Sequence, residues 1–254
     1  MKKGFALFFV GLAVAALGIA SSAEAVTTLD LTAGAGTSGF LNTAFFAWTD
    51  LDHNSTGSGV LDPFVRIQAN GTEQGYNTDN PPVFNEKTNA TDTHSLLLSS
   101  VPIVTLNGIQ YREFLLDVGE GGGNNFLSLD QIKIWLRPTG GDTTTTLASF
   151  GTPLFDLDGN GDNTIKLKGS LNPGNGKGDM FAYIPNSLFG GSDPYVLLYS
   201  QFGTNFSSDG SFEEWAVCHT AGGCTGLEIP EPSSLSLLGI GLLGFWKRRR
   251  SKKA

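Results

Sequence analysis

The sequence predicts an all-β protein: a β-sandwich ectodomain with jelly-roll-like topology, an N-terminal signal helix and a short C-terminal transmembrane helix. Charged residues make up only 16 % of the 254 residues and glycine alone contributes 34, which is typical of a turn-rich β protein. Short runs with strand character recur at roughly ten-residue spacing between turn residues. Before the last apolar run, no stretch sustains helical periodicity. We expect one sandwich over residues 26–228, with two small domains meeting near residues 138–146 as the alternative.

The clearest predicted element is a β-hairpin. Residues 101–106 and 109–118 are apolar runs on either side of Asn107-Gly108. Asn-Gly between two such runs favours a type I′ turn, because this turn needs a positive φ at both central positions. In the second strand, Phe114 and Leu116 are expected on one face and Leu115 on the other.

Further strands are expected along the rest of the chain. In the strand at 127–137, Ile132 and Ile134 share one face, and Trp135 lies on the opposite face between Lys133 and Arg137. Polar residues 75–89 predict a surface loop, and glycines 121–123 predict a turn. The remaining expected strands cover residues 40–48, 60–69, 164–167, 180–184, 195–202 and 212–217.

Residues 1–25 have the three parts of a secretory signal peptide. Lys2 and Lys3 form a basic start, residues 5–19 are apolar, and Ala23 and Ala25 are the small residues of a cleavage site. Cleavage after Ala25 is expected, with an uncleaved membrane anchor as the alternative.

The chain ends in a tail of three parts within residues 229–254. Pro230, Glu231 and Pro232 continue neither a helix nor a central strand, residues 233–246 are largely apolar, and residues 247–253 are basic. The basic residues hold this end on the cytoplasmic side of a membrane. In this order, the three parts resemble the sorting tail of PEP-CTERM proteins. The resemblance implies a protein exported across the inner membrane of a Gram-negative bacterium that makes exopolysaccharide, held in that membrane at least transiently and handled by an exosortase.

The apolar part of the tail is short for a permanent anchor. Leu235 to Trp246 is twelve residues long, against the roughly 20 that a bilayer crossing needs. We therefore interpret the tail as a sorting label that holds the protein briefly and presents the Pro-Glu-Pro motif to a membrane protease.

The charge is distributed unevenly. Eight of the 16 Lys and Arg residues lie in residues 1–25 or after Trp246, but only one of the 24 acids does. Residues 26–246 therefore carry 23 acids against 8 bases, a net charge of −15. Such a surface repels nucleic acid, so nucleic-acid binding is excluded, and it suits divalent cations.

The segment Asp156 to Asn163 has the composition of a calcium loop. Asp156, Asp158, Asn160 and Asp162 alternate in a glycine-containing run, and carboxylate and amide oxygens are the ligands that Ca²⁺ prefers. Leu167 stands where an EF-hand carries its bidentate Glu, so a full EF-hand is not expected. The alternative is an acidic β-turn without an ion. Residues 50–54 (DLDHN) are a weaker version of the same pattern.

Trp135 is a candidate ligand-binding residue. A Trp exposed on a sheet can stack against a sugar ring, and Trp48, Trp215, Tyr76 and Tyr195 would extend such a surface. The alternative is a core Trp covered by the stems of its basic neighbours.

Cys218 and Cys224 are the only cysteines, and in an exported protein they predict a disulfide. Nucleophile, zinc-protease and phosphate-loop motifs are absent from the sequence. Glu113, Glu120, Glu213 and Glu214 are candidates for paired hydrolytic carboxylates only in the sense that acids are abundant.

The sequence favours an exported, non-enzymatic protein of the cell surface or the exopolysaccharide matrix, with no catalytic residues and no cofactor other than Ca²⁺. A glycan-binding sandwich module is the second interpretation, and a secreted glycoside hydrolase is the third. An aromatic row on an exposed sheet would favour the second. Two carboxylates facing each other across a concave pocket would favour the third.

Overall fold

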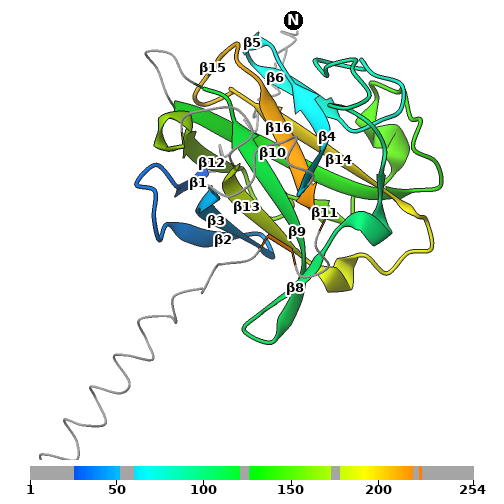
Figure 1. Cartoon of the computed structure of the whole chain (residues 1–254), viewed down its shortest axis with the longest axis horizontal. Coiled ribbons are helices and arrows are strands. Elements are labelled where there is room, and N and C mark those ends of the chain that lie inside the picture. Colours follow the sequence, from blue (N-terminus) through cyan, green and yellow to red (C-terminus); the bar gives the residue numbers. More distant parts are fainter. Residues whose placement is uncertain (1–25, 52–59, 121–125, 173–177, 220–222, 225–254) are drawn as a thin grey trace, which may run out of the picture.

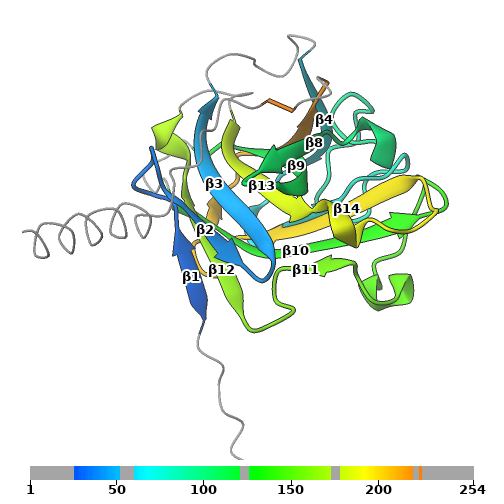
Figure 2. The same ribbon diagram turned by 90° about the horizontal axis from the view of Figure 1, so that it is seen from below.

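A computed structural model describes residues 26–51, 60–120, 126–172, 178–219 and 223–224. These residues form an all-β sandwich of two packed sheets, with β10 central in one and β9 central in the other (Figures 1 and 2). The expected signal peptide and sorting tail, the glycine turn at 121–123 and residues 52–54 lie outside the described residues. Among the described residues, no helix has the length and apolar character that a bilayer crossing requires.

The first sheet, named here the β10 sheet, has five strands on its main path. Their order is β1 (Thr27–Asp30), β12 (Asn163–Lys168), β10 (Phe126–Arg137), β14 (Tyr195–Phe202) and β6 (Glu73–Tyr76), with β11 (Phe155–Asp156) on β10 and β7 (Leu96–Leu97) on β14. β1 pairs with β12 in parallel, and the other pairings of this sheet are antiparallel.

The second sheet, named the β9 sheet, has six strands on its main path. Their order is β2 (Ser38–Leu41), β3 (Ala44–Leu51), β13 (Gly178–Pro185), β9 (Ile109–Val118), β16 (Glu213–Cys218) and β4 (Leu61–Ile67), with β8 (Ile103–Leu106) on β9. β5 (Asn70–Gly71) and β15 (Ser208–Asp209) form a separate small ladder. Short 3₁₀ turns cover Leu98–Ser100, Leu147–Phe150, Gly169–Leu171 and Asn186–Leu188.

The main core lies between the two sheets. Phe114, Leu116 and Trp215 of the β9 sheet and Ile132 and Ile134 of the β10 sheet belong to one buried cluster. This cluster runs in sequence from Leu31 to Val217 and so includes residues on both sides of segment 138–146. The faces predicted for β9 and β10 are confirmed, because Leu115 and Trp135 belong to other clusters.

The outer faces of both sheets are also covered. On the β9 sheet, Phe45, Phe181 and Tyr183 form a second buried cluster. On the β10 sheet, Tyr76, Trp135, Leu197 and Tyr199 form a third cluster, which Phe84 and Phe150 cover. The central strands are therefore apolar on both faces, which explains their near-continuous hydrophobic sequence.

The Asn107-Gly108 hairpin is confirmed: φ is 50° at Asn107 and 80° at Gly108, and Leu106 pairs with Ile109. The single strand expected at 40–48 is instead a second hairpin. Asn42 has a φ of 50° and turns the chain between β2 and β3. The sequence reasoning missed this turn because Asn42-Thr43 lacks the glycine that marks most such turns.

Candidate functional site

The acidic turn at Asp156–Asn163 lies between β11 and β12, and its oxygens serve as internal acceptors. Asp156 Oδ2 lies 2.6 Å from Lys133 Nζ, and Asp156 Oδ1 accepts the Asp158 N–H at 3.1 Å. Asp158 Oδ1 in turn accepts the Asn163 N–H at 2.9 Å. Burial raises the pKa of Asp158, and the Asp156 and Asp162 charges raise it further.

Asn160 in the same turn accepts a hydrogen bond from Asn163 Nδ2 at 3.1 Å, and the backbone carbonyl of Asp162 accepts the Thr27 N–H at 2.8 Å. Among the described residues, the acids of this turn do not form a group of three whose oxygens converge within 4.8 Å. Asp156 and Asp158 accept hydrogen bonds within the turn, and Asp156 also contacts Lys133, whereas the calcium site expected here stays a prediction. The weaker DLDHN pattern lies mostly outside the described residues.

Trp135 does not present a stacking face to solvent. Its side chain is 4 % exposed, its Nε1 donates to the Gly151 carbonyl at 3.0 Å, and its ring lies 5.4 Å from that of Phe150. The expectation of an exposed Trp135 is therefore wrong: residues 147–151 fold over the outer face of the β10 sheet, where the aromatic side chains pack together.

The other aromatic candidates do not form an exposed row beside Trp135. Tyr76 and Trp215 are fully buried, Trp48 is partly buried against the main core, and Tyr195 is half-buried. Arg137 pairs with Asp142 at 2.9 Å, and its guanidinium lies 4.6 Å from the Phe150 ring centre. It therefore helps to hold residues 147–151 over the outer face of the β10 sheet.

Cys218 and Cys224 are joined by a disulfide with a Cα–Cα distance of 5.6 Å. The Cys224 N–H donates to Glu113 Oε1 at 2.7 Å. Glu113 and the two sulfurs lie within 4.8 Å of one another, but the sulfurs are bonded to each other and offer no thiolate to a metal. Burial raises the pKa of Glu113 to about 7.

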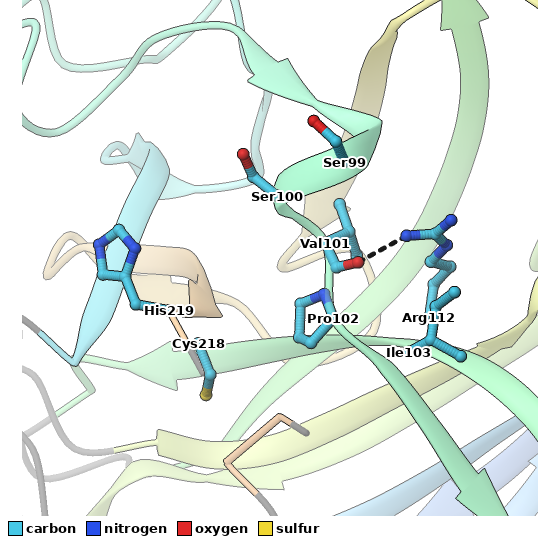
Figure 3. Close-up of a pocket in the computed structure, with 8 residues that line it drawn as sticks. All are labelled: Ser99, Ser100, Val101, Pro102, Ile103, Arg112, Cys218 and His219. Atoms are coloured by element: carbon cyan, nitrogen blue, oxygen red, sulfur yellow. Dashed lines mark hydrogen bonds between the residues drawn. The ribbon is translucent and has the colours of Figure 1, made fainter. Parts of the chain in front are cut away.

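A shallow cavity of about 420 Å³ lies beside the disulfide (Figure 3). Its lining residues are Ser99, Ser100, Val101, Pro102, Ile103, Arg112, Cys218 and His219. Arg112 Nη1 donates to the carbonyls of Leu98 at 2.9 Å and Val101 at 2.6 Å, so its charge holds the adjoining turn. The lining contains no carboxylate, and within the described residues no hydrogen bond joins a serine of the cavity to His219. A nucleophile–base pair is therefore not assembled here.

The glutamates considered for hydrolysis are buried and do not line the cavity. Glu113, Glu120, Glu213 and Glu214 are each at most 2 % exposed. Glu113 lies against the disulfide, and Glu214 is paired with Arg66, whose Nε is 2.6 Å from Glu214 Oε2. No two of the four line the cavity beside the disulfide.

Glu120 and Glu213 lie instead with Glu73 at one end of the sandwich. The three glutamates are here called the acid end. Glu73 begins β6, Glu120 follows β9, and Glu213 begins β16. Their exposed fractions are 0, 2 and 0 %. Figure 1 shows the start of β6 at the same end of the molecule as β5 and β15. The sequence reasoning missed Glu73, because nothing in its local pattern distinguishes it from a solvated strand residue.

Burial is the main influence on these carboxyl groups. It raises the pKa of Glu120 to about 7 and raises the pKa of Glu73. For Glu213 it raises the pKa well above the ordinary value, and the neighbouring Glu73 carboxyl adds to this effect. Full ionisation of all three groups is therefore costly without a compensating charge.

Residues 228–251 match the family model of the PEP-CTERM protein-sorting motif. No curated protein and no solved structure is significantly similar to the chain. The chain thus carries a PEP-CTERM sorting motif, and the match at residues 228–251 confirms the resemblance on which the predicted sorting tail rests. The motif implies an exported protein of Gram-negative bacteria that is membrane-held before processing by an exosortase, itself a membrane protein.

Proposed function

We propose that this chain is a non-enzymatic structural protein of the cell surface or the exopolysaccharide matrix. The PEP-CTERM motif at residues 228–251 carries the proposal, because it assigns the sandwich to the exported side of the inner membrane. The exosortase acts on the tail, and the sandwich is then released into or anchored within the polymer layer. The net charge of −15 over residues 26–246 suits a hydrated protein in such a layer.

The burial of the acids supports a non-enzymatic role. A glycosidase needs two carboxyl groups that reach the scissile bond from opposite sides, about 5 to 9.5 Å apart. Glu113, Glu120, Glu213 and Glu214 are each at most 2 % exposed, so none of these side chains reaches a polysaccharide without a rearrangement of the sandwich. Glycan binding through Trp135 is likewise not favoured, because Phe150 and Gly151 cover its ring.

The proposed location can be tested by changing the tail. The full chain is produced in a Gram-negative host that has an exosortase, beside a variant with Pro230→Ala, Glu231→Ala and Pro232→Ala. Ser234→Ala, just outside the motif, is the matched control. We expect the unchanged chain and the control in the surface or matrix fraction as a shortened product. The triple variant is expected to stay full-length in the inner membrane. Accumulation of the unchanged chain in the periplasm would contradict the proposed destination.

The non-enzymatic role needs a separate readout. The processed protein is incubated with exopolysaccharide from the same host, and the polymer length is followed by size-exclusion chromatography. We expect retention of the protein by the polymer and no change in polymer length. Release of oligosaccharides would establish a hydrolase instead.

A further inference from the structure

The acid end brings three carboxyl groups together without a basic partner. Among the described residues, none of the salt bridges involves Glu73, Glu120 or Glu213. A buried carboxylate normally has a basic partner, a set of hydrogen-bond donors or a metal ion. The hydrogen-bond donors available to each group therefore decide how its charge is balanced.

Glu213 has the fewest hydrogen-bond donors of the three glutamates. Its Cα partners are Val118 on β9 and Ile67 on β4, both in the main core, so its side chain points between the sheets. Neither of its carboxyl oxygens has a hydrogen-bond donor among the described residues. The Glu73 carboxyl lies beside it, and the two groups can share a hydrogen bond only while one of them is protonated.

Glu73 and Glu120 each have one backbone N–H as a partner. Glu73 Oε2 accepts the Ala69 N–H at 2.6 Å, whereas Oε1 has no donor among the described residues. Both oxygens of Glu120 share the N–H of Asp209, each at 3.0 Å. One N–H each, even with the single hydroxyl proton of Ser208 that the two groups share, cannot satisfy two buried carboxylates, each with about four lone-pair sites.

Ser208 completes the oxygen-rich region. It is 3 % exposed, and its hydroxyl lies beside the carboxyl groups of both Glu73 and Glu120. Oxygen atoms from β6, β15, β16 and the segment after β9 thus lie near one another at this end of the sandwich. Among the described residues, no nitrogen-bearing or sulfur side chain is hydrogen-bonded to the three carboxyl groups.

We propose that Glu73, Glu120 and Glu213, with the Ser208 hydroxyl, form a binding site for Ca²⁺. An all-oxygen ligand set selects a hard cation over zinc or copper. Ca²⁺ accepts irregular sets of six to eight oxygens, whereas Mg²⁺ demands a regular octahedron and retains several waters, for which a buried site is poorly suited. The three carboxylates carry enough negative charge to balance the ion.

Binding also requires the three carboxyl groups to move closer together. The oxygens of the three glutamates do not all lie within 4.8 Å of one another in this structure. Glu120 is held toward the Asp209 N–H on β15, and rotation of its side chain toward Glu213 would bring its oxygens closer to the ion. The ion would then join β6, β9 and β16 at the end of the sandwich. The site differs from the acidic turn at Asp156, whose oxygens are used internally.

Thermal unfolding of the full chain, purified in a mild non-ionic detergent at pH 8, tests the site. Each protein is melted in chelator, in excess Ca²⁺ and in equal Mg²⁺. At a Ca²⁺ concentration about one hundred times Kd, the midpoint should rise by roughly 5–10 °C, and by much less in Mg²⁺. Glu213→Gln should abolish the rise, and because it replaces a carboxyl group whose oxygens have no hydrogen-bond donor among the described residues, it should melt in chelator no lower than the unchanged chain. That second readout shows that the variant is folded.

Asp158→Asn in the acidic turn is the matched control, and it should keep the full Ca²⁺ response. An unchanged midpoint of the original chain in Ca²⁺, or a response that survives Glu213→Gln, would overturn the proposal. So would a response that is lost only in Asp158→Asn. The proposal does not rest on the matrix role, so its failure would leave the proposed function untouched.

Discussion

Two buried glutamates, Glu86 and Glu213, differ in how the fold supports them. Glu86 is 5 % exposed, yet its carboxylate accepts three backbone N–H groups: Tyr76 at 2.8 Å, Val83 at 2.8 Å and Phe84 at 2.6 Å. Glu213 is fully buried and has no donor among the described residues. Burial alone therefore does not define a candidate site. The informative feature is a carboxylate that the surrounding backbone does not satisfy.

Asp130 is a second buried acid that, like Glu86 and unlike Glu213, has several hydrogen-bond donors. It is 7 % exposed and accepts hydrogen bonds from Ser128, Thr164, Thr204 and Asn205 at 2.7–2.8 Å. Acids such as Glu86 and Asp130 fasten loops to the sandwich. The acid end has a similar degree of burial without the donors, which is why we assign it to a cation.

The largest expected effect comes from removing Glu86. Glu86→Ala leaves three N–H groups without an acceptor and loosens the segment that packs against Tyr76 and Tyr199. We expect a loss of roughly 3–5 kcal/mol in the free energy of unfolding, measured by urea denaturation of the full chain. Lys87→Ala, at the exposed neighbouring position, should change it by less than about 0.5 kcal/mol. Equal effects of the two variants would contradict the fastening role of Glu86.

The next effect concerns the ladder that covers the acid end. Gly203 has a φ of 85°, and a Cβ there would lie 2.0 Å from the Gly71 carbonyl oxygen on β5. Gly203→Ala should therefore displace β5, destabilise the protein by roughly 2–4 kcal/mol and weaken the Ca²⁺ response. Gly190, where a Cβ would meet nothing within 4 Å, provides the control as Gly190→Ala. A Ca²⁺-induced shift in the melting midpoint that is the same in both variants would show that the ladder plays no part in the site.

Glu113 is intermediate between Glu86 and Glu213 in its backbone hydrogen bonds. It accepts the Cys224 N–H, which belongs to the loop closed by the disulfide. The double variant Cys218→Ala, Cys224→Ala should lower the free energy of unfolding by about 2 kcal/mol, because the unfolded chain is no longer restrained. It should also release the Cys224 N–H from Glu113. Amide hydrogen exchange at Cys224 in the original chain and at residue 224 in the variant measures this release, and unchanged protection would show that the contact is independent of the disulfide.

The smallest expected effect is an increase in the free energy of unfolding, whereas the preceding variants lower it. In chelator at pH 8, Glu213→Gln should raise the free energy of unfolding by about 1 kcal/mol, since a neutral amide replaces a carboxyl group that has no donor. The same substitution at Glu86 should lower it, because an amide has only one acceptor oxygen for three N–H groups. Urea denaturation of the two variants compares these signs directly, and a shared sign would break the distinction between them.

Much of the fold could be predicted from local patterns. Alternation placed Ile132 and Ile134 in the main core, and the strand expected at 195–202 has the same bounds in the structure. Asn107-Gly108 fixed a hairpin because its turn geometry depends on two residues alone. Strands as short as β7, β11 and β15 were missed, because two residues carry no periodicity.

The candidate site could not be predicted in the same way. Glu73 and Glu213 are brought together by pairing of distant strands, and no local pattern encodes that proximity. Trp135 was misplaced for a related reason: alternation correctly assigned its face but did not show that residues 147–151 cover it. The calcium site expected at Asp156, Asp158, Asn160 and Asp162 stays a prediction, because composition does not reveal that Asp156 and Asp158 also accept hydrogen bonds within the turn.

The central claim is that the buried carboxyl groups of the acid end lack enough hydrogen-bond donors and have no basic partner among the described residues. The pH dependence of stability tests this claim most directly. Burial raises the pKa of Glu73, Glu120 and Glu213, that of Glu120 to about 7, so the folded state holds protons that the unfolded state releases. The contribution of these three groups to stability is then fully present below about pH 4.5 and is lost as pH rises through their raised pKa values, which for Glu120 is about 7. We predict that the free energy of unfolding in chelator falls from pH 5 to 8, and falls less steeply in Glu213→Gln. Identical slopes for the two proteins, or a free energy that rises over this range, would contradict the account.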